Sequence, residues 1–180
     1  EGVSSYIQFI APALVATSMM YGSFFECTYS SFVRMYYQKT FDAIIATPIS
    51  LEEVIAGELL WGATKSLINS AIVLGVILLF GLVHTPYFLF ILPLSFLVGL
   101  LFSALAMCFT AIAPNIDSFN YPAFLFITPM FVLSGTFFPI SSLPAGVQIG
   151  ANLFFPLTHA VTITRALTLR GFNPNLLFDL

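Results

Sequence analysis

The stretch YFLFILPLSFLVGLLFSALAMCFTAIA, residues 87–113, decides the fold, because it carries no charged side chain over its whole length. A helix needs about 20 mostly apolar residues to cross a bilayer, so this stretch predicts a membrane span. The chain is 59% hydrophobic and only 7% charged, whereas a soluble domain is typically about 25% charged. The composition therefore indicates a membrane protein, and no basic stripe supports nucleic-acid binding.

Three further apolar runs predict additional spans, which makes the expected fold all-α and polytopic with four spanning helices. In the first run Pro12 predicts a kink, and Glu26 begins a more polar continuation that we expect to protrude from the bilayer. In the last run Pro129 predicts a break. The three runs are residues 6–25, 59–83 and 121–138.

Charge is concentrated in one part of the chain. Seven of the thirteen Lys, Arg, Asp and Glu residues lie between positions 34 and 65, whereas residues 82–86 contain no Lys or Arg. Because basic residues accumulate on the cytoplasmic side of membrane proteins, the charged connection is predicted to face the cytoplasm. The seven residues are Arg34, Lys39, Asp42, Glu52, Glu53, Glu58 and Lys65.

The charged connection has the pattern of a short amphipathic helix followed by a break and a new helix. Phe41, Ile44 and Ile45 lie on one side of the first helix, and Pro48 disfavours its continuation. Ser50 with Glu53 three residues later is typical of a capping box, which predicts where the second helix begins. These features alone leave an alternative open, namely an ordinary cytoplasmic loop with solvated charges.

Four polar residues are expected near the inner membrane interface: Glu26, Glu58, Lys65 and Asn69. Lys65 and Asn69 are four residues apart and so share a helix face. Ionisable groups at a membrane are often functional, so a gating role is one interpretation, although the position near the interface favours a structural role. The structural role would consist of a Glu58–Lys65 contact two turns apart or a Glu26–Lys65 contact between helices.

The segment after residue 138 is harder to interpret. Arg165 and Arg170 would lie outside the cell unless residues 151–169 cross the membrane, and Pro156 and His159 interrupt that run. The residues alone leave a crossing and a non-crossing segment equally open.

Motifs of catalysis or metal binding are lacking. His84 and His159 have no nearby carboxylate in sequence, and we expect His159 to be a satisfied polar residue at a helix start. Cys27 and Cys108 lie in apolar runs and are expected to be buried, with no disulfide or metal. The 21 Phe and 7 Tyr are expected to face lipid or the interface, with stacking on sugar rings as the alternative. A membrane enzyme and a membrane scaffold are the rival classes of function.

Three stretches together resemble the type-2 permeases of ATP-binding-cassette (ABC) transporters, in particular the branch of nodulation protein J, which exports lipo-oligosaccharides. The resemblance covers nearly the whole chain. Its distinguishing feature is SGTFFP, LP and PLTHAVTITRAL in that order after a TPIS break. The stretches are YYQKTFDAIIATPISLEEVIAGELLWGATKSLINS (36–70), NIDSFNYPAFLFITPMFVLSGTFFPISSLP (115–144) and FFPLTHAVTITRAL (154–167).

The resemblance implies a six-helix permease subunit of the bacterial inner membrane, which works with a separate cytoplasmic ATPase. It implies a second permease copy, most simply as a homodimer, and contact with membrane lipid. ATP and Mg²⁺ would be bound by the ATPase, and this chain would bind no cofactor or metal. The chain departs from the six-helix pattern by lacking the first and last spans, so residues 1–180 are read as one permease domain in fragment form.

The resemblance also implies roles for particular residues. Residues 36–50 would form a cytoplasmic coupling segment, and residues 138–170 would form re-entrant helices on the outer side. Thr158, His159 and Arg165 would then lie near the outer mouth of the transport path. The residues implied in coupling to the ATPase are Lys39, Phe41, Asp42, Ile44, Ile45, Thr47 and Pro48.

Overall fold

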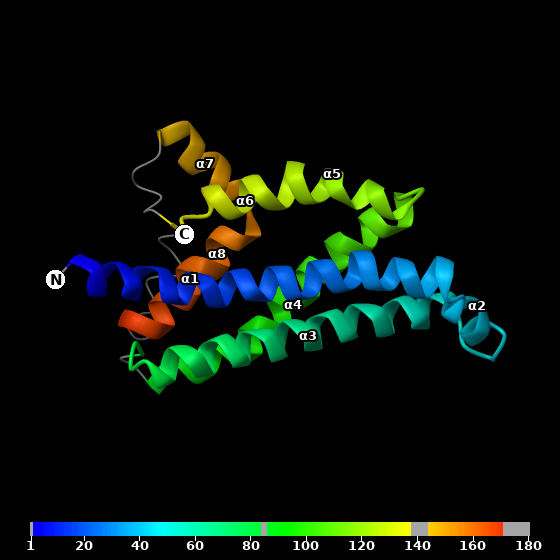
Figure 1. Ribbon diagram of the computed structural model, residues 1–180, viewed down its shortest axis with the longest axis horizontal. Helices are drawn as coiled ribbons and strands as arrows, with labels where there is room; N and C mark the ends of the chain where they lie inside the picture. Colours follow the sequence, from blue (N-terminus) through cyan, green and yellow to red (C-terminus); the bar gives the residue numbers. More distant parts are fainter. Residues whose placement is uncertain (1, 84–85, 138–143, 171–180) are drawn as a thin grey trace.

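The computed structural model describes residues 2–83, 86–137 and 144–170 (Figure 1). Over these residues the chain is helical, with turns and no strand, so the predicted all-α fold is confirmed. Four helices are long and apolar enough to cross a membrane, as the sequence predicts. They are Tyr6–Tyr37, Leu51–Leu79, Pro86–Ile112 and Ile116–Leu133.

The first span is longer than its apolar run. Helix α1 (Gly2–Phe25) passes through Pro12 and is continued by two π-helical segments, Glu26–Ser30 and Val33–Tyr37. The predicted polar continuation is therefore helical. π-helical turns are rare and often mark functional positions, and here they begin at the first charged residue after the apolar run.

The charged connection folds as the sequence predicts. Lys39 adopts a left-handed backbone conformation, with φ of 54°, and turns the chain into the short helix α2 (Thr40–Ile45). Ser50 then caps α3 (Leu51–Leu79): its hydroxyl accepts from the Glu53 N–H at 3.3 Å, and its own N–H donates to Glu53 Oε2 at 2.8 Å. The capped helix and the second span are one continuous helix.

The third and fourth spans follow. The third consists of a 3₁₀ turn, Pro86–Phe90, and α4 (Ile91–Ile112). The fourth consists of a 3₁₀ turn, Ile116–Phe119, then α5 (Asn120–Pro122), a π-helical segment Ala123–Ile127, and α6 (Thr128–Leu133).

The break predicted at Pro129 is wrong, because Ile116–Leu133 is one helix. Pro129 lies in the first turn of α6, directly after the π-helical segment, and membrane helices tolerate a proline where local π-helical turns and Thr side chains, here Thr128 on the Ala123 carbonyl, satisfy backbone groups.

The segment after the fourth span contains α7 (Ala145–Phe154), α8 (Pro156–Arg165) and a π-helical end, Ala166–Arg170. Part of the predicted re-entrant region, residues 138–143, lies outside the described residues, as does His84. At 1.5 Å per residue each of these ten-residue helices is about 15 Å long, half of what a span requires.

Helix α1 occupies the centre of the molecule. It packs against α3, α4 and α8, and Figure 1 shows α1 beside α3 with α4 crossing behind them. The main core consists of residues from α1, α4, α6, α8 and the segments around them. Its largest fully buried side chains include Met20, Phe24, Phe102, Ile127, Met130 and Leu157.

Small residues allow α3 and α4 to approach closely. A Cβ at Gly99 would lie 3.0 Å from the Cα of Ala63 and 2.5 Å from the Cβ of Ser66. Ser66 also donates to the carbonyl of Ser95 at 3.0 Å, across the same helix pair. Such contacts hold membrane helices together where no hydrophobic effect separates protein from lipid.

The two cysteines differ in environment. Cys27 is buried, as expected, but Cys108 is exposed on α4. The expectation for Cys108 is therefore wrong, because the side of α4 that carries it is not covered by the described helices. Both are free cysteines.

We expect Gly99→Ala to destabilise the protein by roughly 1–3 kcal/mol, because the added methyl group overpacks the α3–α4 contact. The measurement is thermal unfolding in detergent. Gly75→Ala in α3 is the matched control, since a Cβ there meets nothing within 4 Å. Equal unfolding midpoints for the two variants would contradict the close-packing interpretation.

We expect cysteines at Asp117 and Ile149, both exposed, to label from opposite sides of the membrane in a variant without Cys27 and Cys108. By the distribution of basic residues, Asp117 is cytoplasmic and should be protected from an impermeant reagent in intact cells, whereas Ile149 should react. The reverse pattern would invert the orientation of all four spans.

Candidate functional site

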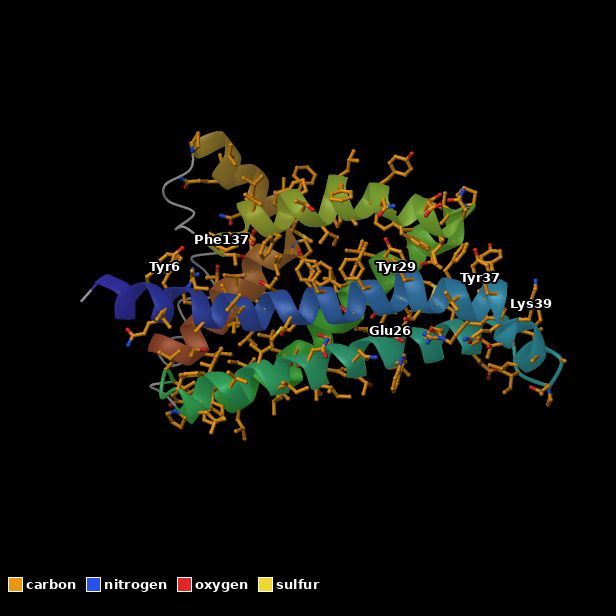
Figure 2. The ribbon with its side chains drawn as sticks, in the orientation of Figure 1. Tyr6, Glu26, Tyr29, Tyr37, Lys39 and Phe137 are labelled. Carbon is orange, nitrogen blue, oxygen red and sulfur yellow. The ribbon has the colours of Figure 1, made fainter. Side chains whose placement is uncertain are left out.

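Four ionised side chains meet where the extension of α1 lies beside α3. Arg34 pairs with Glu58 through two bonds, Nε to Oε1 at 2.9 Å and Nη2 to Oε2 at 2.5 Å. Its Nη1 lies 3.1 Å from Glu26 Oε1, and Lys65 Nζ lies 3.4 Å from Glu26 Oε2. We call Glu26, Arg34, Glu58 and Lys65 the charge cluster, and Figure 2 shows Glu26 between the two helices.

Neutral side chains complete the coordination of both carboxylates. Ser31 donates to Glu58 Oε2 at 2.6 Å, and the Trp61 indole N–H donates to Glu26 Oε1 at 2.9 Å. The side chains of Glu26 and Glu58 are only 10% and 13% exposed. A paired and hydrogen-bonded carboxylate tolerates such burial, whereas an isolated one does not. The cluster therefore joins α1 to α3 as a closed, neutral unit.

The structure confirms one predicted contact and corrects another. Glu26 pairs with Lys65 between helices, as predicted. The Glu58–Lys65 contact is wrong, because Arg34 occupies the Glu58 carboxylate.

Sequence reasoning used Arg34 only as an orientation signal and missed its role in the cluster. The available signal was its spacing of eight residues from Glu26, which places both on about the same helix face.

Asn69 lies apart from the charge cluster. Its amide packs against Gly22 of α1, where a Cβ would collide with it. Asn69 therefore belongs to a different part of the α1–α3 contact than the charged residues with which it was grouped.

The predicted coupling segment, residues 36–50, turns back through α2 and is mostly exposed, with one buried anchor; we call it the α2 hairpin. Phe41 is only 3% exposed, whereas Ile45 is 41% exposed. Because α2 packs against Val33–Tyr37 and α3, Phe41 holds the hairpin in place and is not on the surface available to a partner.

Of the seven residues implied in coupling, Phe41 is buried and Ile44 is half-buried, whereas the other five are exposed. Lys39 and Asp42 form an ion pair at 3.7 Å, with both side chains about two-thirds exposed, and such a pair adds little stability. The exposed residues are Lys39, Asp42, Ile45, Thr47 and Pro48.

Two of the three residues assigned to an outer mouth, Thr158 and His159, make local contacts. Thr158 is buried and donates to the carbonyl of Ala151 at 3.2 Å. His159 Nε2 lies 2.8 Å from the carbonyl of Asn152. These two contacts hold the start of α8 against α7, and the expectation of a satisfied histidine at a helix start is confirmed.

Arg165 connects α8 to two other segments. Its Nη2 donates to the carbonyls of Phe9 and Gly135, at 3.2 and 3.1 Å. Its guanidinium also lies over the Phe9 ring, 3.8 Å from the centroid, a favourable cation–π geometry. Among the described residues, no group of three or more His, Cys, Asp or Glu is placed to hold a metal ion.

Comparison with known proteins identifies the family. Residues 2–169 match the family model described as ABC-2 type transporter. The chain is 38% identical to nodulation protein J of Sinorhizobium fredii, over 89% of this chain and 61% of that protein. It is also 38% identical to nodulation protein J of Rhizobium meliloti, over 94% of this chain and 64% of that protein.

A more distant relative is the inner membrane transport permease YadH of Escherichia coli, 25% identical over 88% of this chain and 61% of that protein. No solved structure matches. The chain thus spans somewhat less than two thirds of the length of these relatives. With a family match over nearly its whole length and four apolar spanning helices, it is a multi-pass membrane protein that belongs to the ABC-2 type transporter family.

Proposed function

We propose that the chain is the membrane-spanning part of an ABC exporter permease, driven by a separate cytoplasmic ATPase that binds the α2 hairpin. The observation that carries this proposal is the hairpin itself. It lies beyond the paired ends of α1 and α3 (Figure 1), is anchored by the buried Phe41, and leaves Asp42 and Ile45 exposed. A small apolar contact flanked by charges suits docking with a defined orientation.

The charge cluster supports transmission of movement from this hairpin. Helix α2 contacts the π-helical segment Val33–Tyr37, and that segment contains Arg34, which is bonded to Glu58 of α3. Displacement of α2 by an ATPase would therefore act on α1 and α3 together. Alternating access between two conformations requires that they lie close in free energy.

The rest of the assembly follows from this role. ATP and Mg²⁺ bind to the ATPase, and two permease copies, most simply a homodimer, enclose the path in the bacterial inner membrane. In the predicted outer region, the described helices α7 and α8 are re-entrant and pack on the spans. Two features support this: α7 and α8 are each too short to cross, and Arg165 fixes α8 to α1.

The substrate is proposed to be a lipid-linked or oligosaccharide-type molecule. The support is the similarity to several proteins named nodulation protein J. Efflux of a drug or other small molecule by the same architecture is the alternative within the family, in line with the more general name of the YadH permease. A membrane scaffold without transport is the remaining alternative, and it requires no ATPase.

We expect Ile45→Glu to abolish co-purification of the ATPase and stimulation of its hydrolysis, because it places a charge at the exposed apolar contact. Phe41→Ala should instead destabilise the hairpin, by roughly 3 kcal/mol for a buried phenylalanine. The measurements are pull-down of the ATPase and hydrolysis in proteoliposomes.

The control for this test is Asn120→Glu, an exposed position at the start of α5, near the predicted cytoplasmic end of the fourth span. Unchanged pull-down and hydrolysis with Ile45→Glu would contradict docking at α2, and loss of both with Asn120→Glu would make the effect non-specific.

We expect Arg34→Gln to lower the free energy of unfolding by about 2 kcal/mol, because it leaves two poorly exposed carboxylates without their main partner. Lys39→Gln, which removes an exposed pair, should change it by less than about 0.5 kcal/mol. ATP hydrolysis by the partner ATPase, measured at a temperature where Arg34→Gln stays folded, distinguishes a structural role of the cluster from a role in transmitting movement. Full stimulation there would make the cluster purely structural, whereas reduced stimulation supports transmission.

A further inference from the structure

The described helices leave one face of α1 and its π-helical continuation only partly covered, although α1 lies at the centre of the described helices. Ser18, Gly22, Phe25, Tyr29 and Val33 recur every three or four residues and therefore share this face. None of them is fully buried, and Phe25 is 37% exposed. We call these five residues, with Tyr21 beside them, the α1 strip.

Aromatic rings form a continuous line along the strip. Tyr21 and Phe25 are stacked in parallel, with centroids 5.6 Å apart and an interplanar angle of 3°. The Phe25 and Tyr29 centroids are 5.8 Å apart. The strip therefore presents a nearly uninterrupted aromatic surface over more than two helical turns.

The line of rings continues beyond the strip at both ends. Tyr21 contacts Phe131, which contacts Phe137; Tyr29 contacts Phe119, which contacts Phe32 and, through it, Tyr37. Figure 2 shows Phe137, Tyr29 and Tyr37 along the same side of α1, between it and the helix formed by α5 and α6. The aromatic contacts thus run most of the length of the first span.

Two hollows with polar groups in their walls flank the strip. The first, about 370 Å³, lies between α1 and α3 and is lined by Ser18, Tyr21, Gly22 and Asn69 together with two apolar residues of α3. The second, about 350 Å³, is lined by Tyr29, Ser30, Val33, Arg34 and Gln38.

Asn69 is the residue of the first hollow that best indicates the chemistry of an occupant. Its amide makes no side-chain hydrogen bond within the part of the chain that the structure describes, and it lies in the apolar half of α3, four residues beyond Lys65. The absence of a side chain at Gly22 provides the room it occupies. An unpaired amide in hydrocarbon is costly, so its position favours a polar occupant over lipid chains.

The charges of the strip indicate what kind of polar occupant fits. The first hollow is lined by no ionised residue. In the second, the guanidinium of Arg34 is already paired with Glu26 and Glu58. The strip therefore offers ring faces and neutral hydrogen-bonding groups without a net charge, which suits an uncharged, hydroxyl-rich molecule better than a phosphate or an amine.

We propose that the α1 strip binds the uncharged glycan head of an amphiphile. The apolar faces of the sugar rings lie on Tyr21, Phe25 and Tyr29, and the sugar hydroxyls bond to the Asn69 amide and the tyrosine hydroxyls. A few placed polar groups on a mostly apolar surface are typical of small-molecule sites. This inference rests on the proposed export function and names the part of the substrate that the permease recognises.

The test uses the protein in nanodiscs of phosphatidylethanolamine and phosphatidylglycerol, with no ATPase present. The probe is dodecyl β-maltoside carrying a diazirine on its sugar, and labelled residues are identified by mass spectrometry. Label should fall on the α1 strip and around Asn69. Unlabelled dodecyl β-maltoside should compete, whereas octaethylene glycol monododecyl ether, which has the same alkyl chain and no sugar, should not.

Two variants and a control define the site. Asn69→Leu and Tyr29→Ala should each weaken competition by dodecyl β-maltoside about fivefold, the loss expected for one neutral contact. Phe124→Ala, which removes a 70% exposed ring outside the strip, should leave it unchanged. Thermal unfolding midpoints close to that of the unmodified protein show that each variant is folded.

Three results would overturn the proposal. Equal competition by the sugarless detergent would make the strip a surface for alkyl chains. Unchanged competition in both strip variants would place the label elsewhere. Disulfide formation between two copies carrying Phe25→Cys, in a background without Cys27 and Cys108, would assign the strip to a permease–permease interface. Because no ATPase is present, none of these results bears on docking at α2.

Discussion

The architecture depends on the simultaneous packing of α1 against three other helices. Helix α1 packs on α3, α4 and α8, and in a membrane this arrangement must be held by close contact and internal hydrogen bonds, because lipid chains are as apolar as leucine. Thr110 of α4 illustrates the point: its hydroxyl donates to the carbonyl of Cys27 at 2.7 Å, where the π-helical segment begins. Small and hydroxylated residues thus determine the geometry of the interior more than large apolar ones do.

The charge cluster is compatible with this apolar setting because it is internally neutralised. Its two carboxylates and two cations come from α3 and from the π-helical continuation of α1, and each carboxylate also accepts from a neutral donor. A cluster of this kind ties two helices together at a defined register without requiring water. Because the cluster lies next to α2, its ion pairs and hydrogen bonds are concentrated at the joint between the hairpin and the spans.

Much of the fold was predictable from local signals. The four spans follow from apolar runs of sufficient length, and the start of α3 follows from Ser50 and Glu53, whose capping bonds involve only neighbouring residues. The break at Pro129 was mispredicted because a proline signal gives no indication of a π-helical segment immediately before it.

The site was less predictable, because its contacts lie between helices. The burial of Phe41 depends on how α2 folds back on its neighbours, which a hydrophobic pattern does not specify. The partner of Glu58 depends on the register of α1 after Glu26, which the π-helical turns alter. The Glu26–Lys65 contact could be predicted only as one of two alternatives.

Trp61 is the only tryptophan of the chain, and its indole N–H is bonded to Glu26 at the edge of the charge cluster. Its ring also lies 5.8 Å from the ammonium group of Lys65. Indole emission is sensitive to nearby charge and to the loss of a hydrogen bond. The chain therefore carries its single indole at the joint between its helices, and with excitation that selects tryptophan over tyrosine a rearrangement there can be followed without attaching a dye.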